Sequence, residues 1–332
     1  MKVIALSAVL FIVGCSSLST GISKREFDDQ WEQFKQQYRS DINGYQSQHE
    51  EQYRRSVFED NYRKIVGHNL EAAQGVHTYT MGVNGFSDMT SSEFLNKYTS
   101  HLEPIDVQQL PMTVYNASVS VPDSHDWRSS RKVGHIKNQG QCGSCWAFAS
   151  VAIIESRLAI KKGSLRSLSE QEIIDCTSGY DCQHGGNIQM ATQTLNRLGG
   201  IESDNHYPYI SGSGGKDSCH YQADRRVAHV GIKLHYVYGE AAMQQSVYQN
   251  GPLYVHVYAN ADFQHYRSGI FSSDSCNDQT NHAVTVVGYG PGYWIIKNSW
   301  STSWGEQGFM RMTRDHDMCR VSSSPIWTDD IQ

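Results

Sequence analysis

Two cysteines in the stretch QCGSCWAFAS, Cys142 and Cys145, lie three positions apart. This spacing is compatible with a redox-active dithiol, with half of a zinc site, or with a nucleophilic thiol beside a structural cysteine. A reactive thiol needs a stabilised thiolate, which a helix N-terminus or a neighbouring imidazolium provides. Cys145 stands where a helix is expected to begin and Cys142 precedes it, so Cys145 is the better candidate for a nucleophile.

The cysteine count bears on the same question. Cys15 lies behind Lys2 and the apolar residues 3–14, which is typical of a secretory signal peptide over residues 1–17. The letters IVGC that end at Cys15 also fit a bacterial lipoprotein signal, which would anchor the chain there. Removing the signal leaves seven cysteines on a route where disulfides persist. One thiol is then left over, either for an intermolecular link or as a reactive group.

A thiol nucleophile also needs a base, and two polar residues near the C-terminus stand out by their context. His282, in TNHAVTVVGYG, begins an apolar segment that is expected to be a strand. Asn298, in WIIKNSWSTSWG, ends the next such segment and is flanked by Trp294, Trp300 and Trp304. An amide there could orient an imidazole, and the indoles could shield that contact from water.

The elements that must position these residues form an α+β pattern after residue 121. Helices are expected over 146–162, from a capping-box pair at Ser169 and Glu172, and over about 188–198. After about residue 225, segments such as LYVHVYA are rich in β-branched and aromatic residues and are bounded by glycine, which favours strands. The pattern therefore predicts one helical lobe and one β-rich lobe.

The preceding part of the chain has a different character. Residues 20–100 contain no cysteine, and helices are expected over 27–38 and 46–69. Six residues of the second helix recur at steps of three or four and share one face: Glu50, Arg54, Phe58, Asn61, Ile65 and Asn69. Residues 101–120 contain prolines and no helical period, which indicates an exposed linker, and Asn116 begins an N-glycosylation sequon.

Length and charge exclude several classes of protein. The 332 residues suffice for one large domain or two smaller ones with a real core. The formal net charge is -6 and no run of Lys or Arg occurs, which argues against nucleic acid as a partner. No segment after the signal is apolar for long enough to cross a bilayer, so we expect no membrane partner.

Five blocks of the sequence, taken in order, resemble papain-like cysteine proteases of the cathepsin L-like branch. NQGQCGSCWAF, NHAVTVVGYG and IIKNSWSTSWGEQGF are similar to the three signature blocks of that family. The six-residue face described above resembles its inhibitory propeptide helix. GVNGFSD is similar to the second propeptide motif through Gly82, Asn84, Phe86 and Asp88. The resemblance covers nearly all of the chain after the signal and implies a full-length preproenzyme.

The resemblance implies a role for each candidate. Cys145 would be the nucleophile and His282 its proton partner in a thiolate–imidazolium pair. Asn298 would orient the imidazole, and Trp300 would cover that contact. The side-chain amide of Gln139 and the backbone N–H of Cys145 would stabilise the oxyanion. The implied reaction is peptide-bond hydrolysis through a thioester acyl-enzyme, with no cofactor and no metal.

The family also implies a disulfide pairing and a substrate cleft. The bridges would be Cys142–Cys182, Cys176–Cys219 and Cys276–Cys319, which leaves Cys145 free. Gly143, Gly185 and Gly186 would contact the substrate backbone, although CQHGG here is one residue longer than the usual CNGG. The pocket for the second residue before the cut would be lined by Asn187, Ile188, His256, Thr280, Ala283 and Ser324, beside Trp300.

The same resemblance implies a choice of substrate. No acidic side chain is expected at the bottom of this pocket, so a hydrophobic side chain is expected at the second residue before the cut. Endopeptidase action in an open cleft is also expected. His256 would make this choice change with pH if its ring faced the pocket, and would not if it pointed into solvent.

The implied organisation is a papain-like two-lobed fold, a helical lobe and a β-barrel-like lobe with the cleft between them, preceded by a helical inhibitory propeptide. Its parts would be a signal at 1–17, a propeptide at 18–120 with an inhibitor domain at about 27–88, and a peptidase domain at 121–332. Protein and peptide substrates, the chain's own propeptide and cystatin-like inhibitors would be its partners. We expect a monomer that is lysosomal, endosomal or secreted.

Three other hypotheses were weighed. A catalytically silent binding protein of the same family would usually lack the cysteine, histidine or glutamine, and all are present here. A thioredoxin-like oxidoreductase would need both Cys142 and Cys145 free and a strand-first pattern. A zinc site would need further ligands at short spacing, for which Cys176 and Cys182 are candidates, but the secretory route favours disulfides.

Overall fold

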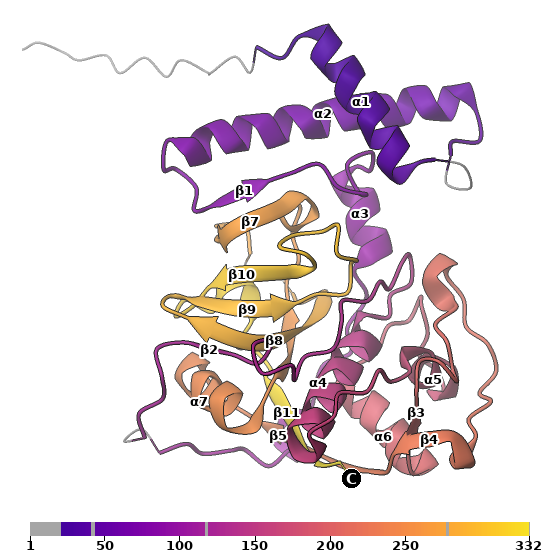
Figure 1. Ribbon diagram of the computed structural model, residues 1–332, viewed down its shortest axis with the longest axis vertical. Helices are drawn as coiled ribbons and strands as arrows, with labels where there is room; N and C mark the ends of the chain where they lie inside the picture. Colours follow the sequence, from indigo (N-terminus) through magenta and orange to yellow (C-terminus); the bar gives the residue numbers. More distant parts are fainter. Residues whose placement is uncertain (1–20, 41–43, 117–118, 277–278, 332) are drawn as a thin grey trace, which may run out of the picture.

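The computed structural model describes residues 21–331 except 41–43, 117–118 and 277–278, so the expected signal at 1–17 and Cys15 lie outside the described residues. Figure 1 shows two crossed helices, α1 and α2, at one end of the molecule, above a sheet-rich lobe that lies beside a helical lobe. These are the two lobes and the helical N-terminal part that the sequence predicts.

The N-terminal part consists of α1 (Lys24–Tyr38) and α2 (Gln48–Ala73). Both helices begin after a serine, and the hydroxyls of Ser23 and Ser47 accept hydrogen bonds from backbone N–H groups in the first turn. These caps place the helix starts at Lys24 and Gln48 instead of the expected 27 and 46. Trp31, Phe34 and Phe58 form the small aromatic core between the helices.

The chain then runs from this helical part onto the sheet-rich lobe. Strand β1 (Tyr79–Met81) pairs antiparallel with β7 (Tyr266–Phe271), and α3 (Ser91–Tyr98) follows with a complete capping box at Thr90 and Glu93. The N-terminal part is therefore joined to the rest of the molecule through backbone hydrogen bonds as well as side chains.

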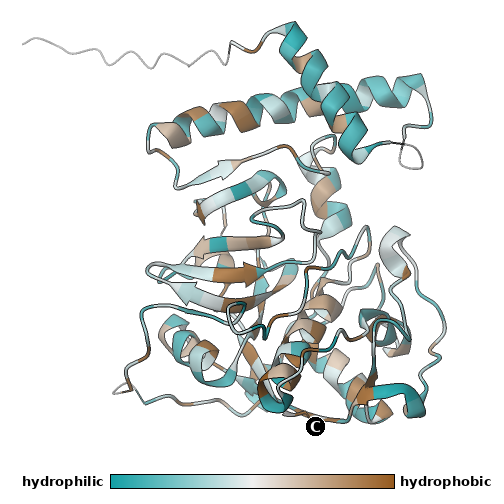
Figure 2. Ribbon diagram, viewed as in Figure 1, coloured by the Kyte–Doolittle hydropathy of each residue, from teal (hydrophilic) through white to brown (hydrophobic). Residues whose placement is uncertain are grey.

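The helical lobe is built around α4, which lies in the interior against both lobes. Fourteen of its residues are buried, and Figure 2 shows hydrophobic residues along it, whereas α1 and α2 are mostly hydrophilic. Left-handed glycines at Gly163 and Gly199 end α4 and α6. The elements of this lobe are α4 (Cys145–Lys162), α5 (Glu170–Cys176), α6 (Ile188–Leu198), β3 (Ile201–Glu202) and β4 (Arg226–Ala228).

The other lobe is a sheet with the order β1-β7-β10-β9-β8-β6-β11-β5, in which β2 also pairs with β8. No pairing among the described residues joins β1 to β5, so the sheet is open, and the expectation of a barrel-like lobe is corrected to that extent. Its elements are β2 (His125–Asp126), β5 (Val230–Tyr236), α7 (Glu240–Asn250), β6 (Leu253–Val257), β8 (His282–Gly290), β9 (Tyr293–Lys297), β10 (Phe309–Thr313) and β11 (Ile326–Ile331). Short 3-10 helices occur at Val107–Gln109, Ser211–Ser213, Ala223–Arg225, Phe263–His265 and Met318–Arg320.

One local expectation needs correction. The Ser169 hydroxyl accepts the backbone N–H of Glu172, but the Glu172 carboxylate does not return to Ser169 as a capping box requires. It accepts the backbone N–H of Glu202 at 2.7 Å instead. Since Glu202 lies in β3 and the Ser169 N–H donates to its carbonyl, pairing across the lobe replaces the local cap.

Three disulfides brace the two lobes. Cys142–Cys182 and Cys176–Cys219 lie in the helical lobe, and Cys276–Cys319 lies in the sheet lobe. These are the pairs that the family resemblance implies. Among the described residues Cys145 is the free cysteine.

Candidate active site

Cys145 is the first residue of α4, so the unpaired N–H groups and the dipole of that helix face its side chain. Its sulfur is buried where the two lobes meet. The backbone N–H of Ala283, from β8 in the opposite lobe, donates to Sγ at 3.4 Å. The hydroxyl of Ser100, the residue directly before the linker, lies 3.2 Å from the same sulfur. A single thiol therefore sits between the lobes and beneath the linker.

His282 is the first residue of β8 and directly precedes Ala283, whose backbone N–H contacts this sulfur. Its Nε2 is 2.8 Å from Oδ1 of Asn298, and because an amide oxygen can only accept, Nε2 carries the hydrogen. Nδ1 is buried and has no hydrogen-bond partner among the described residues. Trp300 stacks on the imidazole with ring centroids 4.5 Å apart. The ring is thus held by Asn298 and Trp300 with one nitrogen free for proton transfer.

Burial keeps both members of this pair neutral. Desolvation raises the pKa of the Cys145 thiol, although hydrogen bonds from Ser100 and from Ala283 oppose the shift. Desolvation lowers the pKa of His282 to about 4, and the hydrogen bond to Asn298 opposes it only in part. With the linker in place, the arrangement favours thiol and imidazole over thiolate and imidazolium.

Gln139 is fully buried beside the cysteine loop. Its Oε1 accepts the hydroxyl of Ser299 at 2.7 Å, and its Nε2 donates to the carbonyl of Cys142 at 2.9 Å. Nε2 also lies 3.4 Å from the carbonyl of Tyr98, which accepts the Trp300 indole N–H as well. The Tyr98 carbonyl, at the end of α3, therefore accepts from side chains of both Gln139 and Trp300.

The linker passes over three glycines that the sequence singles out. A Cβ on Gly143 would lie 2.9 Å from Cβ of Ser100, and one on Gly185, whose φ is +69°, would lie 1.8 Å from the carbonyl of His101. Leu102 forms a parallel bridge with Gly186. Because any side chain at these glycines would displace the linker or a neighbouring ring, their small size keeps the groove open to a peptide backbone.

The extra residue of CQHGG is absorbed in a compact turn closed by Asp181. Its carboxylate accepts the backbone N–H groups of Gln183 and His184 and contacts Nδ1 of His184. The carbonyl of the same residue accepts the N–H of Gly185 at 3.1 Å. The longer loop consequently still places its two glycines against the linker. Asp181 has no motif of its own, so the sequence did not reveal this role.

The remaining pocket residues fall into two groups. Asn187 caps α6 through Oδ1, while its Nδ2 donates to the carbonyls of Glu103 and Pro104 in the linker. Ile188 and Ala283 are fully buried in the core shared by the lobes, which also contains Leu102. Thr280 is half-buried and Ser324 is buried two residues before β11, and neither has a described contact that defines a pocket wall.

His256 is turned away from solvent. Its Nε2 lies 2.8 Å from the hydroxyl of Tyr254, a buried residue on the same face of β6 that the sequence analysis did not single out. Desolvation, with a smaller contribution from His282, lowers the pKa of His256 to about 3. The ring is therefore neutral while it is buried as in this structure.

A family model described as papain family cysteine protease matches residues 121–328, and one described as cathepsin propeptide inhibitor domain (I29) matches residues 31–94. The chain belongs to the papain family of cysteine proteases. Its similarity extends over the propeptide as well as the protease domain, in agreement with the sequence analysis.

Relatives and solved structures of the papain family cover nearly the whole chain. Mouse (Mus musculus) cathepsin K is 39% identical over 92% of this chain and 94% of its own length. A cathepsin L-like proteinase of Fasciola hepatica is 38% identical over 89% and 91%. Digestive procathepsin L 3 of the Tenebrio molitor larval midgut has a TM-score of 0.81 at 35% identity, over 91% of this chain and 98% of that one.

In this papain-family zymogen the second propeptide motif is organised around Asp88. Its carboxylate accepts two hydrogen bonds from the Arg39 guanidinium and one from the Tyr45 hydroxyl. Arg54 donates to the carboxylate of Glu93 and to the carbonyl of Asp88. The buried ion pair between Arg39 and Asp88 thus ties α1 to the turn before α3.

The other residues of the propeptide face connect α2 with the same turn. Asn61 donates to the carbonyls of Ser87 and Met89, and Asn69 exchanges two hydrogen bonds with the backbone of Met81. Phe58 and Ile65 are buried, and Glu50 accepts the backbone N–H of Gln46 at the helix start. The six-residue face of α2 is therefore a contact face that combines hydrogen bonds with buried apolar side chains.

The propeptide turn docks on the protease domain through a short segment before β7. Asn84 donates to the carbonyl of Gln264, whose own amide donates to the carbonyls of Phe86 and Met89. The backbone N–H of Gly82 donates to the carbonyl of His265. Backbone groups on both sides are thus satisfied across this interface.

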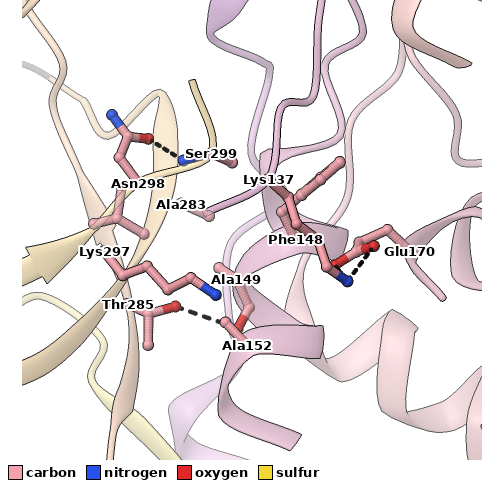
Figure 3. Close-up of a pocket in the computed structure, with 11 residues that line it drawn as sticks. Lys137, Phe148, Ala149, Ala152, Glu170, Ala283, Thr285, Lys297, Asn298 and Ser299 are labelled. Atoms are coloured by element: carbon pink, nitrogen blue, oxygen red, sulfur yellow. Dashed lines mark hydrogen bonds and ion pairs between the residues drawn. The ribbon is translucent and has the colours of Figure 1, made fainter. Parts of the chain in front are cut away.

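Behind Asn298, the two lobes meet at a small cavity and a group of buried charges. Figure 3 shows the Lys297 side chain reaching from the sheet lobe toward α4, with the ion pair of Lys137 and Glu170 across the cavity. Lys137 also pairs with Glu155. Burial, opposed by Lys137, raises the pKa of Glu170. Lys137 and Glu170 thus lie at the cavity that Asn298, the partner of His282, also lines.

Within the part of the chain that the structure describes, no helix is long and apolar enough to cross a membrane.

Proposed function

We propose that the chain is the precursor of a cysteine endopeptidase in which Cys145 is the nucleophile and His282 its proton partner. The observation that supports these roles best is the free thiol at the start of α4, between the linker and the β8 backbone. Once the linker leaves, water reaches both groups. The desolvation that now favours the neutral pair then falls, and the helix dipole favours the thiolate.

The reaction follows from these roles. The Cys145 thiolate attacks the peptide carbonyl carbon, and the imidazolium of His282 gives its proton to the leaving amine. A water molecule, deprotonated by the neutral imidazole, then cleaves the thioester and regenerates the thiol. Asn298 is proposed to hold the ring through Nε2 so that Nδ1 faces the reacting atoms, and Trp300 to keep water from that contact.

The oxyanion would be held by the Nε2 amide of Gln139 and the backbone N–H of Cys145. The carbonyl of Tyr98, at 3.4 Å from Gln139 Nε2, supports this proposal because a carbonyl oxygen already lies within reach of that donor. The hydrogen bond from Ser299 would keep the amide oxygen of Gln139 turned away and its nitrogen toward the substrate.

Substrate binding is proposed along the path of the linker, against Gly143, Gly185 and Gly186. The buried position of Leu102 beside Gly186 supports a hydrophobic side chain at the second residue before the cut. Asn187, Ile188, Thr280, Ala283 and Ser324 would line that pocket, with the neutral pair of Tyr254 and His256 nearby. We propose cleavage within chains, as the resemblance to cathepsin L-like proteases implies.

The parts of the precursor are proposed as a signal at residues 1–17, a propeptide to about residue 120 and a mature enzyme from about Val121. The signal would direct the chain to a lysosome, an endosome or the exterior, and Asn116 would be an acceptor for glycosylation. The mature enzyme would act as a monomer, and cystatin-like inhibitors would bind its cleft.

Acidification of the purified precursor, followed by an epoxide inhibitor specific for cysteine proteases, tests this function. We expect a shortened chain that begins near Val121 and carries the label on Cys145. Cys145→Ala, as the matched control, should show neither shortening nor label.

A catalytically silent binding protein would give neither result in the wild-type chain, even after the propeptide is removed by an added protease. That outcome would overturn the proposal. Label on a cysteine other than Cys145 would overturn the assignment of the nucleophile.

A further inference from the structure

Strand β5 is the last strand of the sheet, so one of its edges has no neighbouring strand among the described residues. The linker covers the end of this edge, where Met112 forms a parallel bridge with Tyr236. The backbone N–H of Thr113 donates to the carbonyl of Tyr236 at 2.9 Å, and the Tyr236 N–H donates to the carbonyl of Pro111 at 3.0 Å. Both backbone polar groups of Tyr236 are therefore satisfied by the linker.

Side chains of the linker alternate at this place as they do in a strand. Thr113 faces inward and its hydroxyl accepts the indole N–H of Trp327 at 3.0 Å, and Tyr115 packs against the core of the sheet lobe. Met112 and Val114 face outward and are 56% and 79% exposed. The linker thus behaves as a short added strand with two side-chain anchors.

Removal of the propeptide would uncover the edge of β5 at Tyr236. The N–H and C=O of Tyr236 and the indole N–H of Trp327 would then lose their partners in the linker. An open strand edge with unpaired groups is a template for another extended chain, which binds through its backbone and gains specificity from alternate side chains.

The linker also shows how this edge is connected to the cleft. One continuous segment passes from Ser100 on the cysteine, through Leu102 at Gly186, to Thr113 at Tyr236. Residues 110–116, LPMTVYN, which lie on or beside the edge, contain no charged side chain. An uncharged, extended peptide can therefore occupy the cleft and the strand edge at the same time.

We propose that Tyr236 and Trp327 form an exosite of the mature enzyme for an extended, uncharged segment of a substrate chain. We take a substrate to run through the cleft in the direction opposite to the linker, so the segment lies N-terminal to the scissile bond. About ten residues separate it from the pocket at Gly186, as many as separate Leu102 from Met112. The inference rests on the proposed function, because removal of the propeptide during maturation is what uncovers the edge of β5.

Kinetics on the mature enzyme test the exosite. A short fluorogenic peptide that fills only the cleft is compared with the same peptide extended at its N-terminus by an uncharged segment of twelve residues. We expect the extension to lower KM roughly tenfold without a change in kcat, because the second contact acts within one complex. In Tyr236→Pro, which removes one edge N–H at a position where an edge strand tolerates proline, the advantage should disappear while the short peptide is cleaved normally.

A binding measurement that needs no catalysis accompanies the kinetics. A labelled peptide of residues 107–116 should bind the mature enzyme and compete with the extended substrate only. N-methylation at Thr113 removes the N–H that pairs with Tyr236 and should abolish binding. N-methylation at Val114, whose N–H makes no such bond, is the matched control and should leave binding intact.

The outcomes separate the two proposals. Equal KM for the short and extended peptides, or equal binding of the two methylated peptides, would overturn the exosite. A concentration-dependent dimer that closes the edge against a second copy would also overturn it. Failure to cleave the short peptide, with selective binding of the 107–116 peptide preserved, would overturn the proposed function and show that the strand edge still binds an extended chain.

Discussion

The hydroxyl of Ser100 lies 3.2 Å from the sulfur of Cys145, and the backbone N–H of the same serine donates to the carbonyl of Asn281. The residue that precedes the linker therefore contacts both lobes at the proposed nucleophile. The burial that accompanies this contact raises the pKa of the Cys145 thiol. If Cys145 is the nucleophile, as proposed, the contact and the desolvation both oppose its reaction with a substrate.

Leu102 is expected to hold the linker in place, because it is buried where it pairs with Gly186. Leu102→Ala should weaken the binding of the linker in the cleft by about 2 kcal/mol or more, because apolar contacts are lost. We therefore expect mature enzyme to appear roughly thirtyfold faster at pH 5, as measured by gel analysis over time. Val114→Ala, at a residue that is 79% exposed, is the control and should process at the wild-type rate. Equal rates for the two variants would show that Leu102 does not hold the linker.

Local signals explain why much of the scaffold could be predicted from the sequence. The helix Ile188–Leu198 was predicted with its end at Gly199, because its apolar period and its left-handed glycine are both local features. The position of Cys145 at the start of α4 follows in the same way from the apolar run after it.

Contacts between distant segments explain what could not be predicted. Glu172 turns to a backbone N–H thirty residues away instead of to its local cap, and Tyr254 pairs with His256 only because both face the interior from β6. No local sequence motif marks Ser100 as the residue that contacts Cys145, because its position depends on how the whole linker packs in the cleft.

His265 is expected to make propeptide binding sensitive to acid. It is buried beneath the propeptide, where Gly82 donates to its carbonyl, and neither ring nitrogen has a partner among the described residues. Desolvation, and less strongly the charge of Lys64, which is paired with Asp262, lowers its pKa from 6.5 to about 3. Between pH 6.5 and about pH 3, His265 therefore binds a proton when the propeptide is released but not when the propeptide is docked. Docking should weaken up to about tenfold for each pH unit below 6.5.

The pH at which half of the precursor is processed in a fixed time measures this effect. His265→Leu should move that pH toward more acid values, because the docked state no longer excludes a proton at this position. His206→Leu, at an exposed histidine of the protease domain, is the matched control. An unchanged midpoint in His265→Leu would assign acid sensitivity to other groups.

Glu93, like His265, is expected to make the propeptide bind less tightly in acid. In this case the bound state stabilises the charged form of the group, whereas for His265 it stabilises the neutral form. Burial alone would raise its pKa, but hydrogen bonds from Arg54 and Thr90 outweigh burial and lower it. The pair therefore stabilises the propeptide above the ordinary pKa of a glutamate and loses this contribution as pH falls through the lowered value. Glu93→Gln should speed processing most at the upper end of the pH range and least in strong acid. Asp60→Asn, at an exposed side chain of α2, should have no such effect.

Asn298 is expected to act on turnover more than on substrate binding, because it contacts His282 and not the linker. Asn298→Ala should lower kcat roughly 100-fold through misplacement of the ring, with a smaller change in KM. Asn298→Gln, which keeps an amide at a longer reach, should recover part of the loss. Circular dichroism of both variants checks that they fold. A large rise in KM at constant kcat would contradict the positioning role.

Glu172 is expected to make the protease domain more stable in acid than at neutral pH. It is fully buried, and desolvation, with a further contribution from Glu202, raises its pKa from 4.5 to about 8 although the backbone N–H of Glu202 opposes the shift. Its stabilising contribution is therefore complete below about pH 4.5 and is lost progressively as pH rises toward 8. Thermal unfolding of the mature enzyme, inhibited at Cys145, should show a Tm that falls over this range. Glu172→Gln should make Tm less dependent on pH over this range. Asp224→Asn, at an exposed carboxylate, is the control and should leave the dependence unchanged. Parallel curves of Tm against pH for wild type and Glu172→Gln would show that this carboxyl does not govern stability in acid.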